Sequence, residues 1–418
     1  MQERHVADSF VDPLIKAIIS DADLWDLVIS GIRPVVREVI LPQAGQMAKA
    51  EHIFQDVRDA MKDAGFYGMS IPEQYGGLGK GETGDCLLIY EIGYGDLSVS
   101  LLPLVSTSLF GRCVQVGGTE EQKQRILPKV ASGKIFGCYG LTESGGSSFR
   151  ESIQTRAEKK GDVYVLNGQK IFITEAEEAN MCVVIAKIDG TDGIGAFLVP
   201  NFNHAPEGYK NSNGYVCVSK EKGKPGIHAS ATCSISLENV EVPEEDLLGL
   251  DFEGKQGLGI AVKSLGYSRP TIAAQALGAA KRALAYTMQY ALETPRGDGS
   301  TQLLDRELYR VRLAELTGYL TQATSYLFSV ARVVDQGDVT RDDVLKVYSS
   351  MLKRNATDIA LEIAKQSMGM LGGAGYSGEH PVGRIWTDLG VPSIYEGHND
   401  LQSLHAGKFV VSELRKGY

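Results

Sequence analysis

Residues 163–174 read VYVLNGQKIFIT and lie near the middle of the chain. Two runs rich in β-branched and aromatic residues, 163–166 and 170–174, flank an Asn167-Gly168 pair, a strong sequence signal for a tight β-hairpin. Further short β-rich runs follow at residues 182–186, 196–199 and 232–237. Because no helical segment interrupts these runs, we expect an antiparallel β-barrel or sandwich.

The residues on the N-terminal side of this region show helical periodicity. Apolar residues recur every three to four positions between Leu24 and Ile40, and Pro34 is expected to kink or split that helix. A further helix is expected from Ile53 to Ala64, with Gly65 as its C-cap. The segments 87–94 and 101–116 continue the helical pattern, and the glycine-rich stretch 71–79 before them predicts a loop.

The residues on the C-terminal side form three long periodic segments, 272–293, 308–334 and 344–370, which predict an antiparallel helix bundle. The sequence therefore predicts an α+β fold of three domains. These are an N-terminal all-α domain (1–133), a middle antiparallel β-barrel or sandwich domain (134–252) and a C-terminal four-helix-bundle domain (253–418). A flat ligand would lie in the crevice between the β domain and the helices.

Composition excludes several classes of function. The 418 residues carry a formal net charge of -10, which argues against a nucleic-acid-binding surface. The six cysteines are scattered without a CxxC pair, so free thiols are expected rather than disulfides or a metal site. The N-terminus lacks an apolar signal segment, and no uncharged run is long enough to cross a bilayer. We therefore expect a cytoplasmic protein without membrane insertion.

Three segments carry residue types suited to chemistry. Residues 139–148 (YGLTESGGSS) combine glycines and hydroxyls in a loop that leaves backbone N–H groups available, although most such loops are only turns. Phe172 and Thr174 lie two apart on a strand and so share a face, which suits either a flat ring or the protein core. Residues 393–400 (SIYEGHND) place a carboxyl group, Glu396, near the C-terminus, where a surface or ion-paired carboxylate is the simpler interpretation.

Together these segments resemble the acyl-CoA dehydrogenase family, and the resemblance covers nearly the whole chain. Supporting segments occur in the same order as in the family: 71–79, 157–162, 241–243, 248–249, 268–270 and 371–376. The family fold is the same succession of helical, β and helical parts. By contrast, the G-x-G-x-x-G pattern at 373–378 follows a helix and not a strand, so it is interpreted as a helix-ending turn.

The resemblance implies a role for individual residues. Glu396 takes the position of the catalytic base, and Arg269 with Ser268 and Tyr395 belongs to the substrate region. Ser148 takes the position of a serine near the flavin pyrophosphate and the thioester. The remaining residues implied to contact FAD are Tyr139, Leu141, Thr142, Phe172, Thr174, Gly397, His398, Asp400 and Arg296.

The chemistry of thioester dehydrogenation explains these residue types. The C–H bond next to a thioester is a weak acid, so hydrogen-bond donors must stabilise the negative charge that develops on the carbonyl oxygen. A carboxylate becomes a stronger base when burial raises its pKa. FAD accepts the hydride, while the protein supplies orientation and electrostatics.

The chain departs from the family pattern around the flavin. The turn after the first long C-terminal helix keeps Arg296 but lacks the Phe-Gly that many members carry there. Other departures are Phe149, Glu307, Gly369 and His398. Three outcomes follow, in order of preference: altered FAD contacts in a homo-oligomer, a heteromeric partner that supplies them, or loss of flavin.

The sequence thus predicts α,β-dehydrogenation of an acyl-CoA by a homotetramer or homodimer, with an electron-transfer flavoprotein as acceptor. Ser100 stands where decarboxylating members keep an arginine, so decarboxylation is not expected. Leu101, Leu102 and Leu104 are assigned to the core rather than to the acyl pocket. The alternatives are an acyl-carrier-protein substrate or a non-catalytic flavin-binding subunit. The lysine-rich residues 209–224 form either a solvated loop or a cover for the coenzyme A nucleotide.

Overall fold

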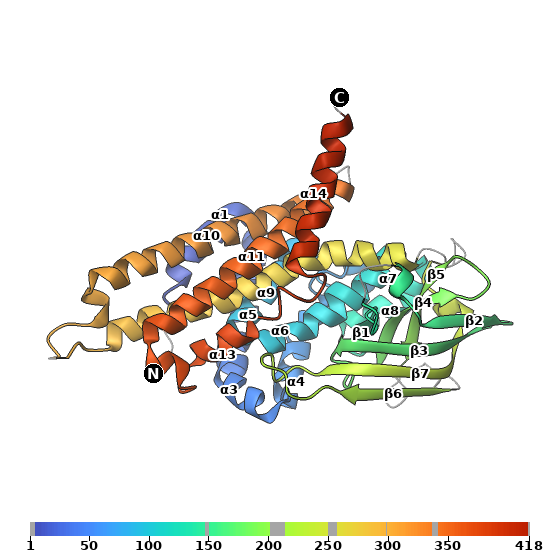
Figure 1. Cartoon of the computed structure of the whole chain (residues 1–418), viewed down its shortest axis with the longest axis horizontal. Helices are drawn as coiled ribbons and strands as arrows, with labels where there is room; N and C mark the ends of the chain where they lie inside the picture. Colours follow the sequence, from blue (N-terminus) through green and yellow to red (C-terminus); the bar gives the residue numbers. More distant parts are fainter. Residues whose placement is uncertain are drawn as a thin grey trace.

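The computed structural model describes residues 5–146, 150–200, 214–249, 257–297, 299–336 and 342–416. Helices come first, a sheet follows, and long helices complete the chain (Figure 1). This succession confirms the predicted fold class. The strands gather at one end of the long axis, and the connection between the long helices α9 and α10 lies at the opposite end (Figure 1).

The N-terminal part is helical, as its periodicity predicts. Pro34 does not split the segment 24–40, because the chain passes it in helical conformation through two short π-helical turns, Val28–Ile32 and Val35–Ile40. Gly65 follows α4 in the left-handed region, with φ 72°. The helices are α1 Asp8–Ile19, α2 Ala22–Leu27, α3 Leu41–Ala50, α4 Gln55–Asp63, α5 Gly81–Gly95, α6 Leu97–Pro103, α7 Arg112–Gly117 and α8 Glu120–Ala131, with a π-helical segment Leu104–Gly111 between α6 and α7.

The sheet has seven strands and is mixed, which corrects the antiparallel prediction. Strand β4 pairs antiparallel with β5 along one edge, but its other edge pairs parallel with β1 and then with β2. The remaining pairs, β2–β3, β3–β7 and β6–β7, are antiparallel. The strands are β1 Gly137–Gly140, β2 Arg156–Lys160, β3 Val163–Thr174, β4 Met181–Ile188, β5 Ile194–Pro200, β6 Tyr215–Lys220 and β7 Thr232–Pro243.

The predicted hairpin turn at Asn167-Gly168 is wrong, because β3 runs unbroken through it. The Asn167 side chain accepts a hydrogen bond of 2.8 Å from the backbone N–H of Asn239 on β7, so it holds two strands together instead of turning one. A Cβ on Gly168 would lie 2.6 Å from the Thr155 hydroxyl, so glycine is needed for close approach. The tight turn of this region is at Gly161-Asp162, between β2 and β3.

The C-terminal helices form the predicted bundle, in which α9 packs against α10 and α11, and α14 packs against α11. Helix α9 also packs against α5, and a Cβ on Gly93 or Gly278 would lie within 2.5 Å of the facing backbone, so these glycines permit the close contact. Helix α14 projects away from the rest of the molecule (Figure 1). The helices are α9 Gly257–Glu293, α10 Glu307–Asp335, α11 Asp342–Leu371, α12 Gly373–Tyr376, α13 Pro381–Asp388 and α14 Asn399–Lys416.

One helical run, Leu97–Gly117, has the length and hydropathy of a membrane span, with a mean hydropathy of 1.5. Protein atoms bury 94% of it, however, and a core helix passes the same test. The run therefore gives only weak support for a membrane span.

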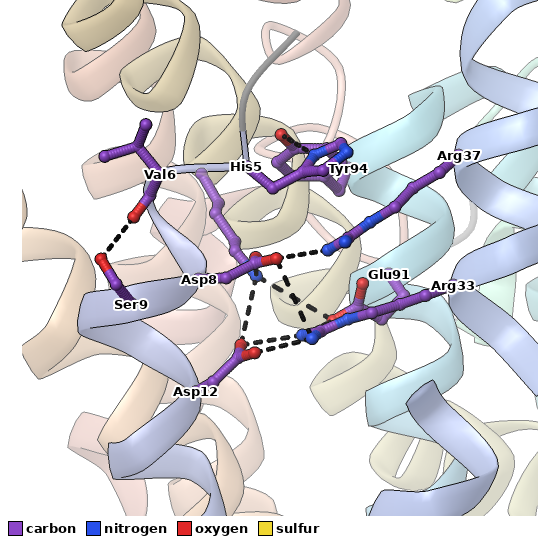
Figure 2. Close-up of polar contacts among 10 residues, drawn as sticks. His5, Val6, Asp8, Ser9, Asp12, Arg33, Arg37, Glu91 and Tyr94 are labelled. Carbon is purple, nitrogen blue, oxygen red and sulfur yellow. Dashed lines mark hydrogen bonds and ion pairs between the residues drawn. The ribbon is translucent and has the colours of Figure 1, made fainter. Parts of the chain in front are cut away.

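Buried charges fix α1 to the helices behind it (Figure 2). Lys281 of α9 is fully buried, and its Nζ lies 2.6 Å from Asp8 Oδ1 and 4.0 Å from Glu91 Oε1. Arg33 contacts Asp12 at 2.6 Å and Glu91 at 2.8 Å. Burial alone would lower the pKa of Lys281, but Glu91, with Tyr90, Asp8 and Asp12, outweighs burial and raises it. The network therefore joins α1, α5 and α9 through interior charges that neutralise one another.

We predict that Lys281→Met lowers the free energy of unfolding by roughly 3 kcal/mol, because it leaves interior carboxylates without their cation. Urea denaturation followed by circular dichroism measures the change. The matched control is Lys365→Met on α11, where an exposed lysine pairs with Glu362, and its effect is expected to stay below about 0.5 kcal/mol. If both substitutions lower the free energy of unfolding equally, the stabilising role assigned to the buried charges around Lys281 is contradicted.

Candidate active site

A cavity of about 320 Å³ lies where the β-strands meet α6, α9, α11 and α14. Its volume is at the lower end of the range for small-molecule sites. Apolar side chains form much of the wall, and a few polar groups point into it. The residues from the N-terminal helices are Leu101, Leu104, Val105 and Leu109, those from the β domain are Tyr139, Leu141, Thr142, Phe172, Ile173 and Thr174, and those from the C-terminal part include Val262, Leu265, Arg269, Ser350, Tyr395, Glu396, Gly397, Leu401, His405 and Phe409.

Glu396 enters this cavity from the turn that precedes α14. The Ser268 hydroxyl of α9 donates a hydrogen bond of 2.5 Å to Glu396 Oε2. The other oxygen, Oε1, is inaccessible to solvent and has no partner among the described residues. Burial raises the pKa of Glu396 to about 7, although the Ser268 hydrogen bond and the charges of Arg269 and Lys353 oppose the rise. A carboxyl group in this state can accept a proton near neutral pH.

Two further buried polar groups line the cavity without a full set of partners. The Tyr139 hydroxyl is buried and has no partner in the described part of the chain. Arg269 is 7% exposed and donates from Nη1 to the Ser350 hydroxyl at 3.2 Å, while its Nε has no described partner. Buried polar groups are almost always hydrogen-bonded in folded proteins. These groups therefore fit a polar ligand in the cavity.

The β domain presents an aromatic side chain to the same cavity. Phe172 lies at a bulge in β3 with φ 58°, since Lys170 pairs with Ile235 but Ile173 pairs with Cys233. Its side chain is 64% exposed, which is unusual for a large aromatic residue inside a folded domain. Phe172 and Thr174 both line the cavity, but so does Ile173 between them, because the bulge interrupts the simple alternation. An open aromatic face beside a hydroxyl fits a flat ring.

A buried ion pair fixes the loop that carries Leu141 and Thr142. Lys170 Nζ lies 2.6 Å from Glu143 Oε1, and both side chains are almost completely buried. Glu143 also accepts hydrogen bonds from the backbone and hydroxyl of Thr155. Burial raises the pKa of Glu143, but the hydrogen bonds from Lys170 and Thr155 lower it overall. The loop backbone is thereby held against the sheet at the edge of the cavity.

The structure separates some of the predicted site residues from the cavity. His398 and Asp400 are exposed and contact each other at 3.4 Å, outside the lining. Arg296 lies beyond the end of α9, and that end, Glu293, is about 36 Å along the helix axis from Arg269. Ser148 lies outside the described residues, as do residues 209–213. The expectation of a loop over 209–224 is corrected for residues 215–220, which form strand β6 and pair with β7.

Several lining residues were not predicted from the sequence. Leu101, Leu102 and Leu104 are buried in the hydrophobic core, as predicted, and Leu101 and Leu104 also line the cavity. Ser350 and His405 were missed because nothing in their neighbourhood resembles a functional motif. The four-residue spacing of Leu401, His405 and Phe409, which all line the cavity, was the available signal for α14.

Comparisons with known proteins agree with this geometry. Three sequence profiles match consecutive parts of the chain: the acyl-CoA dehydrogenase N-terminal domain at residues 26–134, the middle domain at 138–240 and the C-terminal domain at 255–411. An acyl-CoA dehydrogenase of Bacillus subtilis (strain 168) is 33% identical over 91% of this chain and 96% of its own length. The short/branched chain specific acyl-CoA dehydrogenase, mitochondrial, of Bos taurus is 32% identical over 93% and 85%.

Solved structures give the same result. Butyryl-CoA dehydrogenase from Megasphaera elsdenii superposes with a TM-score of 0.85 at 27% identity, covering 94% of this chain and 99% of that one. A structure described as electron transferring flavoprotein of Acidaminococcus fermentans superposes with a TM-score of 0.84 at 30% identity, covering 93% and 98%. The family predicted from the sequence is therefore confirmed: this chain belongs to the acyl-CoA dehydrogenase family.

Proposed function

We propose that this chain dehydrogenates an acyl-CoA at the α,β-bond and that Glu396 removes the α-proton. Family membership makes the chain an oxidoreductase that uses FAD, as predicted. The observation that supports the role of Glu396 is that it lines a cavity of ligand size and has one buried carboxyl oxygen, Oε1, without a partner among the described residues.

The residues around the cavity fit the isoalloxazine ring of FAD. Phe172 offers an open aromatic face, and Thr174 and the Tyr139 hydroxyl offer hydrogen-bonding groups beside it. The loop at Leu141 and Thr142 would face the ring edge. When bound, FAD supplies a hydride acceptor for the β-carbon.

The chain's own residues would perform the proton transfer. Leu101, Leu104 and Val105 would contact the acyl chain and exclude water from it. Ser268 holds one Glu396 oxygen, which leaves Oε1 available to the α-proton. The charge of Arg269 offsets that of the carboxylate and is itself buried, so it acts with little screening by solvent.

The acyl group is proposed to end in an apolar group. Ser100 is fully buried and donates to Gln275 Oε1 at 2.9 Å, and Gln275 in turn donates to the Tyr395 hydroxyl. These neutral groups replace the arginine that a decarboxylating enzyme would need. Coenzyme A is proposed as the carrier, ahead of an acyl-carrier protein. A cytoplasmic location and the domain limits 1–133, 134–252 and 253–418 stay predictions.

The electron acceptor is proposed to be an electron-transfer flavoprotein, which the similarity to the Acidaminococcus fermentans structure supports. A homo-oligomer is proposed because Arg296 lies too far along α9 to reach the cavity of its own chain. It would contact the flavin of a neighbouring subunit instead. A purely flavin-binding subunit is the less favoured candidate, since it would have no use for the arrangement around Glu396.

We predict that Glu396→Gln keeps FAD and acyl-CoA bound but lowers the rate of anaerobic flavin bleaching by about 10³-fold, since a positioned general base contributes roughly that factor. Stopped-flow absorbance of the purified holoprotein gives the rate. Unchanged bleaching would place the base on another residue, and a wild-type protein that never bleaches would favour the non-catalytic subunit.

We predict that kcat/KM rises with pH through about 7, because the pKa of Glu396 is raised to about 7 and only its ionised form accepts a proton. Ser268→Ala removes a hydrogen bond that lowers this pKa, so the rise should move to higher pH. Initial rates with an artificial electron acceptor measure both profiles. A wild-type midpoint near the ordinary glutamate value of 4.5 would contradict the buried assignment.

We predict that Arg296→Ala weakens FAD binding about tenfold by removing a charged hydrogen-bond donor from the neighbouring flavin. Flavin fluorescence released on dilution measures the affinity. Arg306→Ala is the matched control, since Arg306 is also exposed and lies in the same connection between α9 and α10. Equal affinities for both variants would show that the turn does not reach a flavin.

A further inference from the structure

The turn that carries Glu396 has an unfavourable backbone conformation. Glu396 has φ 52° and Gly397 has φ 90°, both in the left-handed region. For a residue with a side chain this conformation costs about 1 kcal/mol or more and persists only where surrounding contacts impose it. The contacts that hold the turn therefore decide where the carboxyl group points.

Two side chains bind the carbonyl groups of this turn. Lys353 of α11 donates from Nζ to the Gly397 carbonyl at 2.9 Å and to Asn399 Oδ1 at 3.0 Å. Gln402 of α14 donates from Nε2 to the Glu396 carbonyl at 3.1 Å and to the Gly397 carbonyl at 2.9 Å. Both side chains are fully buried. The turn is thus held from two helices at once.

Asn399 makes the lysine contact rigid. Its Nδ2 donates to the Thr357 hydroxyl at 2.9 Å and to Asp358 Oδ1 at 2.8 Å, both on α11. The amide oxygen of Asn399 is thereby oriented toward Lys353 Nζ. The first turn of α14 and the middle of α11 are joined at the point where the Glu396 turn ends.

Lys353 differs from the other buried lysines in its partners. Lys170 and Lys281 each lie 2.6 Å from a carboxylate oxygen, whereas the described polar partners of Lys353 are neutral oxygens. Burial lowers the pKa of Lys353 to about 8, against the opposing effect of Glu396. Among the described residues, therefore, no direct ion pair neutralises its charge. Glu396 is the carboxyl group that does most to raise the pKa of Lys353.

We propose that Lys353 is a positioning residue of this site, whose ammonium group holds the Glu396–Gly397 turn and whose positive charge stabilises the carboxylate form of Glu396. The inference rests on the proposed role of Glu396 as base and adds a residue that fixes its direction and its charge. Lys353 acts through the turn and is not assigned a contact with substrate or flavin.

Other charged and titratable groups also face this region, and the test must separate them from Lys353. Arg269 of α9 lowers the pKa of Glu396, and His405 of α14 has a pKa lowered by burial and by Arg269. The charged and titratable groups that interact electrostatically with Glu396 or Lys353 are Glu82 of α5, Tyr139 of β1, Arg269 of α9, Asp358 of α11 and Tyr395 of the turn. His405 of α14 lines the same cavity as Glu396.

The experiment titrates the Glu396 carboxyl group itself. Infrared difference spectra of the purified protein across pH, with Glu396→Gln as the blank, report the midpoint without requiring turnover. Lys353→Met is expected to raise the midpoint by about one pH unit, because a nearby positive charge has been removed. Lys353→Gln serves as a second neutral variant if the methionine variant does not fold. Lys353→Arg restores the charge and should return the midpoint toward wild type.

The matched control is Lys281→Met, which removes an equally buried lysine about 18 Å further along α9 from Arg269. It should leave the Glu396 midpoint unchanged. In the holoprotein of each Lys353 variant, the pH at which kcat/KM rises should shift by the same amount as the infrared midpoint of Glu396. An unmoved midpoint in both neutral variants would overturn the role of Lys353. If the Glu396 titration midpoint moves in the Lys353 variants but the flavin of the wild-type protein never bleaches, Glu396 is rejected as base while the role of Lys353 stands.

Discussion

The site depends on holding one carboxyl group where burial opposes its charge. An isolated carboxylate in a protein interior is costly, so it must be hydrogen-bonded, paired or protonated. Glu396 is stabilised only in part: one oxygen accepts from Ser268, and Arg269 and Lys353 act through their charges. Complete pairing would remove the basicity that proton abstraction needs. The incomplete set of partners is therefore the feature from which the proposed activity follows.

Helix α9 connects this site to the structural core. Ser268 and Arg269 lie in its first half, and Gly278, further along, brings α9 against α5. Lys281 lies about 18 Å from Arg269 along the axis, in the buried network with α1. In that network interior charges are paired directly, whereas around Glu396 they are not. The same helix thus uses fully neutralised charges for stability and partly neutralised charges for chemistry, which is the expected division between core and active site.

The sequence predicted the order of helical and β segments, because helical and strand periods are visible in single segments. The choice of Glu396 as base came from the family resemblance and stays a proposal, and features that depend on tertiary contacts were missed. The Asn167-Gly168 pair has the composition of a turn, yet Asn239 and Thr155, distant in sequence, make it part of a continuous strand. Lys353 resembles any lysine of an amphipathic helix, and only its contact with Gly397 distinguishes it. Leu101 and Leu104 line the cavity, whereas Leu102 does not. The sequence alone does not show which side of this helical run faces the cavity.

Arg296 is far from the cavity of its own chain. If it binds flavin, as proposed, it needs a second subunit, and this reason for oligomerisation does not depend on an exposed apolar surface. The connection between α9 and α10 lies at the end of the molecule opposite to the sheet (Figure 1). A contact from this connection to a flavin, as proposed for Arg296, would therefore join two subunits. In such an arrangement flavin affinity and subunit association are thermodynamically linked, because each increases the other by the same factor. The departures from the family pattern in this turn would then alter assembly and cofactor retention together.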